Sequence, residues 1–309
     1  MNKEYFKVLS SDGVHQLNCK LYVPAGEPIG IFQAVHGMTE HLERYDELLS
    51  LLCVKGFLCV IHDHLGHGKT ANGEGELGFI AHKDGYKRLI DDVHRVYCNV
   101  SEKYKDKKHF LMGHSMGSFI TRLYCRQYGE HLSGYIMMGS GAGNPVADIG
   151  LLLTKVIAKI KGEKHVSPFI DKMAFGGYNK KFSENSSRAW LSANTENREK
   201  YSKDKYCTFK FTVSAMNDLI RLNKECNRKE WFENLPSNLN ILIQSGSSDP
   251  VGEHSKGITK VYNTLAAQNR YNITFKLYKE ARHEILNDFC KEDVIKDIIN
   301  FLDIALCGN

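Results

Sequence analysis

Short apolar runs alternate along the chain with longer stretches in which apolar side chains recur at helical spacing. The runs at residues 30–35, 57–62, 109–112 and 134–138 are largely apolar, which is typical of strands buried on both faces of a parallel sheet. Helical spacing follows the first three of these runs. This alternation predicts an α/β fold with a central parallel sheet.

The two ends of the chain extend the same plan. The tripeptide S-D-G at residues 11–13 is a turn signal, so residues 5–10 and 16–23 are predicted to pair as an antiparallel hairpin. Further on, a strand is predicted at residues 239–244 and another at residues 273–277, each followed by a helix. We therefore expect a mostly parallel sheet, flanked by helices and opened by a hairpin.

The strand–helix rhythm is interrupted in the middle of the chain, where helical and irregular patterns replace it. We therefore expect a core built from residues 1–143 and 237–309, with a helical cap, or lid, inserted at residues 144–236. The first cap helix, predicted at residues 149–160, is rich in leucine and isoleucine on one side and carries lysines near the other. This pattern fits a lid that docks on acyl chains, and it equally fits a helix whose apolar side packs on the core. Contact of the cap with a membrane surface stays open for the same reason.

The composition is that of a folded globular protein, because 42% of the 309 residues are hydrophobic and 25% are charged. The 41 basic and 36 acidic residues are interspersed. Short basic groups such as residues 103–108 fit solvated helix ends, so we expect no nucleic-acid partner.

The cysteines and the N-terminus indicate a cytoplasmic location. The nine cysteines follow no repeating spacing, and Cys53, Cys59 and Cys98 lie inside apolar patterns, which favours reduced thiols over disulfides. The first residues lack the apolar region of a signal peptide, and no stretch approaches a membrane-spanning length. The sequence gives no basis for an oligomeric state.

The pentapeptide G-H-S-M-G at residues 113–117 carries the main chemical signal. It connects a predicted strand to a predicted helix, and G-x-S-x-G in that setting indicates a sharp turn that exposes the serine, Ser115. Its flanking glycines allow the chain to turn tightly. The N–H groups at the start of the helix would face negative charge that develops at the site.

A serine hydroxyl needs an imidazole to take its proton and a carboxylate to orient that imidazole. Asp249 and His283 each follow a predicted strand, at the sheet edge where catalytic groups of parallel sheets gather. They also occur in the order Ser, Asp, His that is typical of this architecture. We predict that Ser115 is the nucleophile, His283 the base and Asp249 the orienting acid.

Two further motifs accompany the serine pentapeptide: H-G-M-T-E-H at residues 36–41, followed by R-Y at residues 44–45, and D-H-L-G-H-G at residues 63–68. With these three motifs the chain resembles the α/β-hydrolase superfamily and, within it, the monoacylglycerol lipase and lysophospholipase group. Looser matches lie at residues 78–81, 190–192 and 204–207. The resemblance implies a cofactor-free serine hydrolase of carboxylic esters, acting on monoacylglycerols or related single-chain lipids. The alternatives are a lysophospholipase, a short-chain carboxylesterase or acyltransferase with the same triad, and a non-catalytic binding protein.

The resemblance also implies roles for residues outside the triad. The backbone N–H groups of Met38 and Met116 would form the oxyanion hole, which stabilises the tetrahedral intermediate. Glu40 and Arg44 would lie near the alcohol side of the site, although an ordinary ion pair at the start of a helix explains them equally well.

Three neighbouring histidines, His62, His64 and His67, raise the question of a metal site. The D-x-x-G-x-G turn already accounts for this segment, and no carboxylate or thiolate set completes a closed site. His283 and Glu284 do not begin a zinc motif, because residue 287 is Asn rather than His. No glycine fingerprint for phosphate or dinucleotide binding occurs. We expect neither a metal nor a cofactor.

Overall fold

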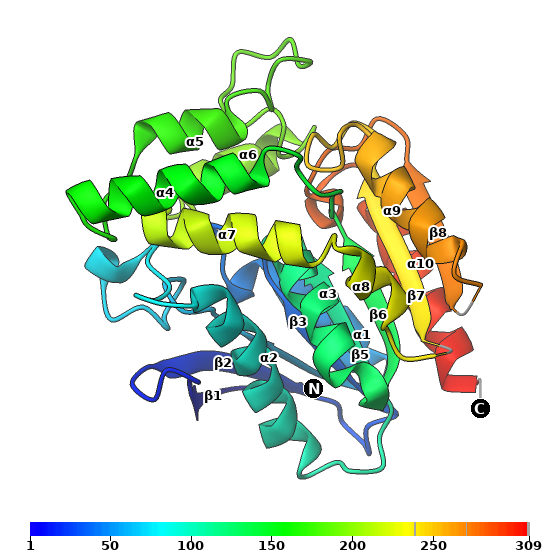
Figure 1. Ribbon diagram of the computed structural model, residues 1–309. Coiled ribbons are helices and arrows are strands. Elements are labelled where there is room, and N and C mark those ends of the chain that lie inside the picture. The colour runs from blue at the N-terminus through cyan, green and yellow to red at the C-terminus, as the bar shows by residue number, and fades with distance from the viewer. Residues whose placement is uncertain (238, 270, 308–309) are drawn as a thin grey trace.

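A sheet of eight strands runs through the centre of the molecule, in the order β1-β2-β4-β3-β5-β6-β7-β8 (Figure 1). The computed structural model describes residues 1–237, 239–269 and 271–307. Within these ranges β2 pairs antiparallel with β1 and β4, and the other neighbours are parallel. The expected mostly parallel sheet with an opening hairpin is therefore confirmed. The strands are β1 (Asn2–Leu9), β2 (Gln16–Val23), β3 (Gly30–Val35), β4 (Phe57–His62), β5 (His109–His114), β6 (Leu132–Met138), β7 (Asn240–Gly246) and β8 (Asn272–Tyr278).

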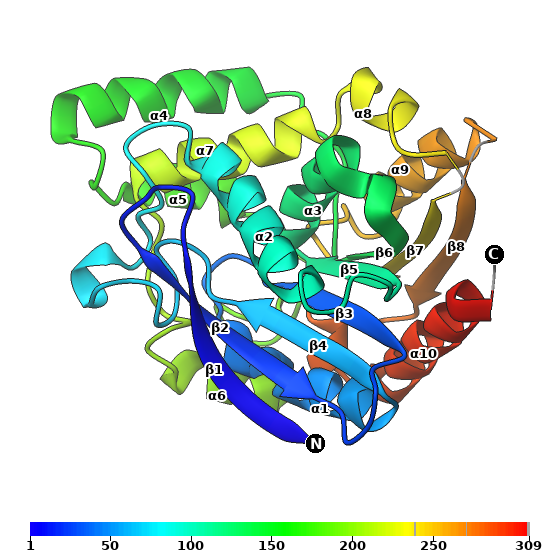
Figure 2. The same cartoon turned by 90° about the horizontal axis from the view of Figure 1, so that it is seen from below.

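Helices cover both faces of this sheet (Figure 2). Helices α1 (Asp46–Val54) and α10 (Lys291–Cys307) pack on one face, and α2 (Gly85–Ser101), α3 (Met116–Tyr128) and α9 (Lys256–Ala266) pack on the other. Every residue of β3, β4 and β5 is buried, which requires an apolar layer on each side. Short 3₁₀ helices lie at Leu42–Tyr45, Glu74–Glu76, Gly129–His131 and Ile285–Asn287.

The bounds of the elements follow burial. The predicted bounds of β3 and β4 are those of the structure, because every residue of both strands is buried. The edge strand β1 begins at Asn2 rather than at residue 5, since its first residues are exposed and carry no apolar pattern. Strand β5 runs two residues beyond its predicted end at 112, to His114.

In the described part of the chain, five helices lie between β6 and β7, in the segment expected to form the cap. Helix α7 packs against α4 on one side and against α2 and α3 on the other, so it connects the outer helices to the body of the molecule (Figure 1). Among the described residues, no helix is both long and apolar enough to cross a membrane. The five are α4 (Ala147–Lys161), α5 (Pro168–Phe175), α6 (Thr195–Lys203), α7 (Val213–Glu225) and α8 (Lys229–Glu233).

Helix α4 turns its small side chains toward α7. Asn217 of α7 donates a hydrogen bond from Nδ2 to Thr154 Oγ1 at 2.7 Å, and Gly150 lies nearby on the same side of the helix. Leu153 and Ile157 pack partly on the core. The interpretation that the apolar side of this helix packs on the core is nevertheless wrong for four large residues. Those left exposed are Ile149, Leu152, Val156 and Ile160.

A cluster of buried histidines lies where β3 and β4 end. The ring centroids of His36 and His64 are 4.1 Å apart, and those of His62 and His64 are 4.9 Å apart. His36 Nε2 accepts a hydrogen bond from the His64 backbone N–H, so its proton is on Nδ1. Burial lowers the pKa of His62 and of His67 to about 4. The cluster therefore packs as neutral imidazoles.

These histidines make the protein sensitive to acid. A buried imidazole that stays neutral takes up its proton only on unfolding, so its contribution to stability is lost as the pH falls from about 6.5 toward 4. Asp92 and Asp218 act in the opposite direction, because burial raises the pKa of these carboxyls to about 6 and about 7. The effect of one histidine is therefore measured best by comparing variants.

We expect His62→Leu to weaken this acid sensitivity. Among the described residues neither ring nitrogen of His62 has a hydrogen-bond partner, so the substitution breaks no such bond. Between pH 6.5 and 4.5 the free energy of unfolding should fall by about 1.4 kcal/mol less per pH unit than in the wild type. Urea unfolding at several pH values measures this. The control, Val54→Leu at an exposed position that carries no titratable group, should leave the slope unchanged; an unchanged slope in His62→Leu would contradict the prediction.

Candidate active site

Ser115 occupies a tight turn between β5 and α3. Its backbone has φ 55° and ψ −123°, a conformation that costs an L-residue energy and needs support from its surroundings. The Ser115 N–H donates to the carbonyl of Met138 at 3.0 Å, which ties the turn to β6. A Cβ on Gly113 would overlap Gly117, and one on Gly117 would overlap the carbonyl of Val35. The turn predicted from the pentapeptide is present.

The structure brings together the three residues predicted as the triad. Ser115 Oγ lies 2.9 Å from His283 Nε2, and His283 Nδ1 lies 3.0 Å from Asp249 Oδ2. Asp249 is wholly buried, and its other oxygen accepts from the Val251 N–H at 2.9 Å. A carboxylate can only accept, so the proton of a neutral His283 is on Nδ1. The lone pair of Nε2 then faces the serine hydroxyl, which is the arrangement for proton abstraction.

The two backbone groups predicted as oxyanion donors flank Ser115. Met116 is the first residue of α3, and Met38 follows Gly37, where an added Cβ would come within 3.0 Å of Ser115 Cβ. Among the described residues, neither N–H group has a hydrogen-bond acceptor. Both are thus placed to donate to an oxygen of a bound ester, and this role remains a prediction.

Glu40 and Arg44 belong to a buried network rather than to an exposed ion pair. Glu40 Oε1 accepts from the Gly37 N–H at 2.5 Å and from Tyr45 Oη at 2.9 Å. Arg44 donates to Glu284 Oε2 at 2.5 Å, and its Nε lies 3.4 Å from Glu40 Oε2. Burial works against the charge of Arg44, but Glu284 and Glu40 raise its pKa. Glu40 therefore holds the loop that carries Met38, the predicted oxyanion donor, and a contact of Glu40 or Arg44 with the substrate alcohol likewise remains a prediction.

Three further residues border the site, and none of them has a role predicted from the sequence. The His114 ring lies 4.8 Å from the His283 ring, and the Trp190 ring lies 5.1 Å from it, as distances between centroids. Glu284 pairs with Arg44. Each of these three residues lies in or beside a motif that the sequence shows, but its position in the sequence does not indicate which group its side chain faces.

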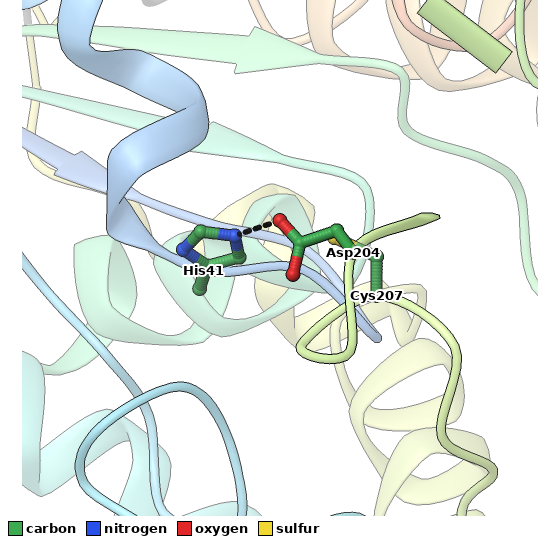
Figure 3. A group of neighbouring side chains, drawn as sticks. All are labelled: His41, Asp204 and Cys207. Atoms are coloured by element: carbon green, nitrogen blue, oxygen red, sulfur yellow. Dashed lines mark hydrogen bonds and ion pairs between the residues drawn. The ribbon is translucent and has the colours of Figure 1, made fainter. Parts of the chain in front are cut away.

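The loop after β3 also contacts the segment that follows α6. His41 Nε2 lies 2.7 Å from Asp204 Oδ2 (Figure 3), and Tyr201 Oη donates to the carbonyl of Thr39 at 2.8 Å. These bonds join two parts of the chain that are far apart in sequence. The loop that carries Met38 is therefore held from the side of the expected cap.

Side chains at this contact between the loop and the segment after α6 are also of types that bind metal ions. Potential ligand atoms of His41, Asp204 and Cys207 lie within 4.8 Å of one another (Figure 3). However, His41 and Asp204 satisfy each other, and burial raises the pKa of the Cys207 thiol, which keeps it in the protonated form that binds metals poorly. The hydrogen bond between His41 and Asp204 and the burial of the Cys207 thiol therefore explain why these three side chains lie together.

Comparison with known proteins adds to this geometry. A family model described as serine aminopeptidase, S33, matches residues 26–289. Monoglyceride lipase of Mus musculus is 26% identical over 285 residues, which cover 89% of this chain and 82% of that protein. Probable lysophospholipase L2 of Haemophilus influenzae is 22% identical over 281 residues, covering 87% of this chain and 82% of its own.

A crystal structure of similar shape is that of a thermostable carboxyl esterase from Bacillus coagulans, in complex with glycerol. It is 28% identical, covers 99% of both chains and has a TM-score of 0.93. The family match extends over most of the chain and includes the turn at Ser115. The protein therefore belongs to the serine aminopeptidase S33 family, and it is a serine ester hydrolase with the α/β-hydrolase fold.

Proposed function

We propose that this protein hydrolyses monoacylglycerols, with Ser115, His283 and Asp249 as its catalytic triad. The observation that carries the proposal is the position of His283, whose two ring nitrogens lie 2.9 Å from Ser115 Oγ and 3.0 Å from Asp249 Oδ2. The substrate class is supported by the relatives named monoglyceride lipase. The glycerol bound to the Bacillus coagulans esterase is the alcohol that such a substrate releases.

The geometry supports an acyl-enzyme mechanism. Ser115 Oγ attacks the ester carbonyl while His283 Nε2 takes its proton, and Asp249 stabilises the imidazolium. The oxyanion accepts hydrogen bonds from the N–H groups of Met38 and Met116, and removal of one such donor typically costs a factor of about a hundred or more in rate. His283 then protonates the departing alcohol. It next activates a water molecule that releases the fatty acid.

Residues 144–236 act in this proposal as a cap that receives the acyl chain from a lipid surface. Several apolar side chains on and beside α4 and α5 are exposed to solvent. Leu152 is 63% exposed and Phe169 is 60% exposed. Lysines of the same two helices lie among them, a combination that suits transient contact with an anionic lipid surface. The exposed set comprises Val146, Ile149, Leu152, Val156, Ile160, Val166, Phe169 and Met173.

Substitution of the nucleophile is the first test. Ser115→Ala should lower kcat by about a thousandfold or more, because no other group can form the acyl-enzyme. A fluorophosphonate should label the wild type with one equivalent at Ser115 and should leave Ser115→Ala unlabelled. The control Ser101→Ala, at the end of α2, should react as the wild type does. Folded, unlabelled wild-type protein would overturn the assignment.

The second test is a ladder of monoacylglycerols from short to long acyl chain, with matched lysophospholipids. We expect Ser115-dependent turnover that persists to long-chain monoacylglycerols. Turnover confined to short esters would instead identify a carboxylesterase, and a preference for lysophospholipids would identify a lysophospholipase. Lack of turnover on esters, amides and thioesters alike would favour a non-catalytic binding protein.

The third test addresses the exposed face of the cap. Leu152→Gln combined with Phe169→Gln should weaken binding to anionic vesicles by about tenfold or more, because each side chain loses roughly 1.5–3 kcal/mol of apolar burial. Hydrolysis of a water-soluble short ester should not change. Val54→Gln on α1, where the valine is 76% exposed, is the matched control. Equal vesicle binding by both variants and the wild type would refute membrane contact.

A further inference from the structure

His114 immediately precedes Ser115, and both nitrogens of its ring face hydrogen-bond acceptors. Nδ1 lies 3.1 Å from Glu40 Oε1, and Nε2 lies 3.3 Å from the backbone oxygen of His283. The carbonyl oxygen of His283 can only accept a hydrogen bond. A neutral imidazole has a single N–H group. Both contacts are hydrogen bonds only if the ring carries two protons.

A carboxylate at Glu40 likewise can only accept. The oxygen that faces His114 already accepts from the Gly37 N–H and the Tyr45 hydroxyl. Burial alone would raise the pKa of Glu40, but the hydrogen bond and charge of His114 lower it to about 2. For His114, burial acts to lower the pKa and is outweighed by Glu40, so that the pKa is raised above its ordinary value.

The charges around the ring balance. His114 and Arg44 face the carboxylates of Glu40 and Glu284, so two cations are matched by two anions in one buried group. A buried charge is tolerated when it is paired and hydrogen-bonded. The neighbouring His283 presents its backbone oxygen to this group and its ring to Ser115. Removal of the charge on His114 would leave a carboxylate without its partner.

We propose that His114 is a buried imidazolium that acts as a positioning residue, joining the oxyanion loop to the backbone of the catalytic histidine. The connection runs from the Gly37 N–H to Glu40, from Glu40 to the His114 ring, and from the ring to the His283 carbonyl. It fixes the separation between the Met38 N–H and the His283 ring. The catalytic meaning of this link rests on the proposed function, whereas the charge of the ring does not.

Gly139 provides the space for this arrangement. A Cβ at this position would come within 3.2 Å of His114 Nε2 and 3.3 Å of His283 Cε1. Its φ of 56° is also a conformation that favours glycine. The end of β6 is thus shaped to let the two histidine rings lie together.

Two substitutions of His114 test its hydrogen bonds to Glu40 and to the His283 carbonyl separately. In His114→Asn the amide falls near the Nδ1 position and faces Glu40, whereas in His114→Gln it reaches toward the His283 carbonyl, and neither variant carries the charge. With 4-nitrophenyl butyrate we expect kcat to fall about 10- to 100-fold in each, because oxyanion donor and base lose their alignment, while KM changes less than about threefold. His109→Asn, a buried histidine at the opposite end of β5, should keep the wild-type kcat.

The pH profile gives a readout that a merely structural role would not change. Because the folded-state pKa of His114 is raised, the link is intact at low and neutral pH and is lost as the pH rises through that value. The kcat of the wild type should therefore decline on the alkaline side. His114→Gln, which has no proton to lose there, should lack this decline.

Nuclear magnetic resonance of the ¹⁵N-histidine-labelled wild type measures the charge directly. We expect both ring nitrogens of His114 to carry protons at neutral pH, the ring signals being assigned in the wild type itself through scalar couplings to the His114 backbone. A neutral His114 would overturn the proposal even if the variants failed to fold. Wild-type kcat in both variants would overturn it while leaving the ester hydrolase intact. A doubly protonated ring in a protein that cleaves no ester would overturn the proposed function alone.

Discussion

The strained backbone of Ser115 is the constraint on which the site depends. A residue at φ 55° and ψ −123° costs of order 1–3 kcal/mol unless its neighbours over-determine it. Here the neighbours are the ends of parallel strands: Met138 of β6 accepts the Ser115 N–H, and Val35 of β3 lies against Gly117. The same parallel arrangement delivers Asp249 after β7 and His283 after β8. The sheet thus holds Ser115 in its strained conformation and also places Asp249 and His283 beside it.

Burial alone does not decide the charge of the histidines in this protein. His62 and His114 are both removed from water, yet burial lowers the pKa of His62 to about 4, whereas that of His114 is raised. The difference is the acceptor: His62 has none among the described residues, and His114 faces the carboxylate of Glu40. The neutral His62 ring packs at the end of its strand, whereas the charged His114 ring connects Glu40 to the backbone of His283. Two roles follow from one side chain and two sets of neighbours.

Features encoded locally could be predicted from the sequence, and features that depend on distant partners could not. The bounds of β3 and β4 follow from continuous apolar runs, and the turn at Ser115 follows from its glycines. The partner of His114 lies 74 residues away in Glu40, and no spacing indicates that contact. Periodicity likewise marks α4 as amphipathic without telling which side faces inward. There the small residues Gly150 and Thr154 are buried and four of the larger apolar ones are exposed.

The loop that carries Met38 is held from two directions, and neither set of contacts involves α4 or α5. On one side His41 and Thr39 bind residues near the end of α6, and on the other Glu40 binds the His114 ring. A group of exposed apolar side chains belongs to α4 and α5 instead, and α4 joins the body of the molecule through α7. In the proposed contact with lipid, α4 and α5 would meet the surface, whereas the bonds that hold the Met38 loop come from α6, the residue after it and β5.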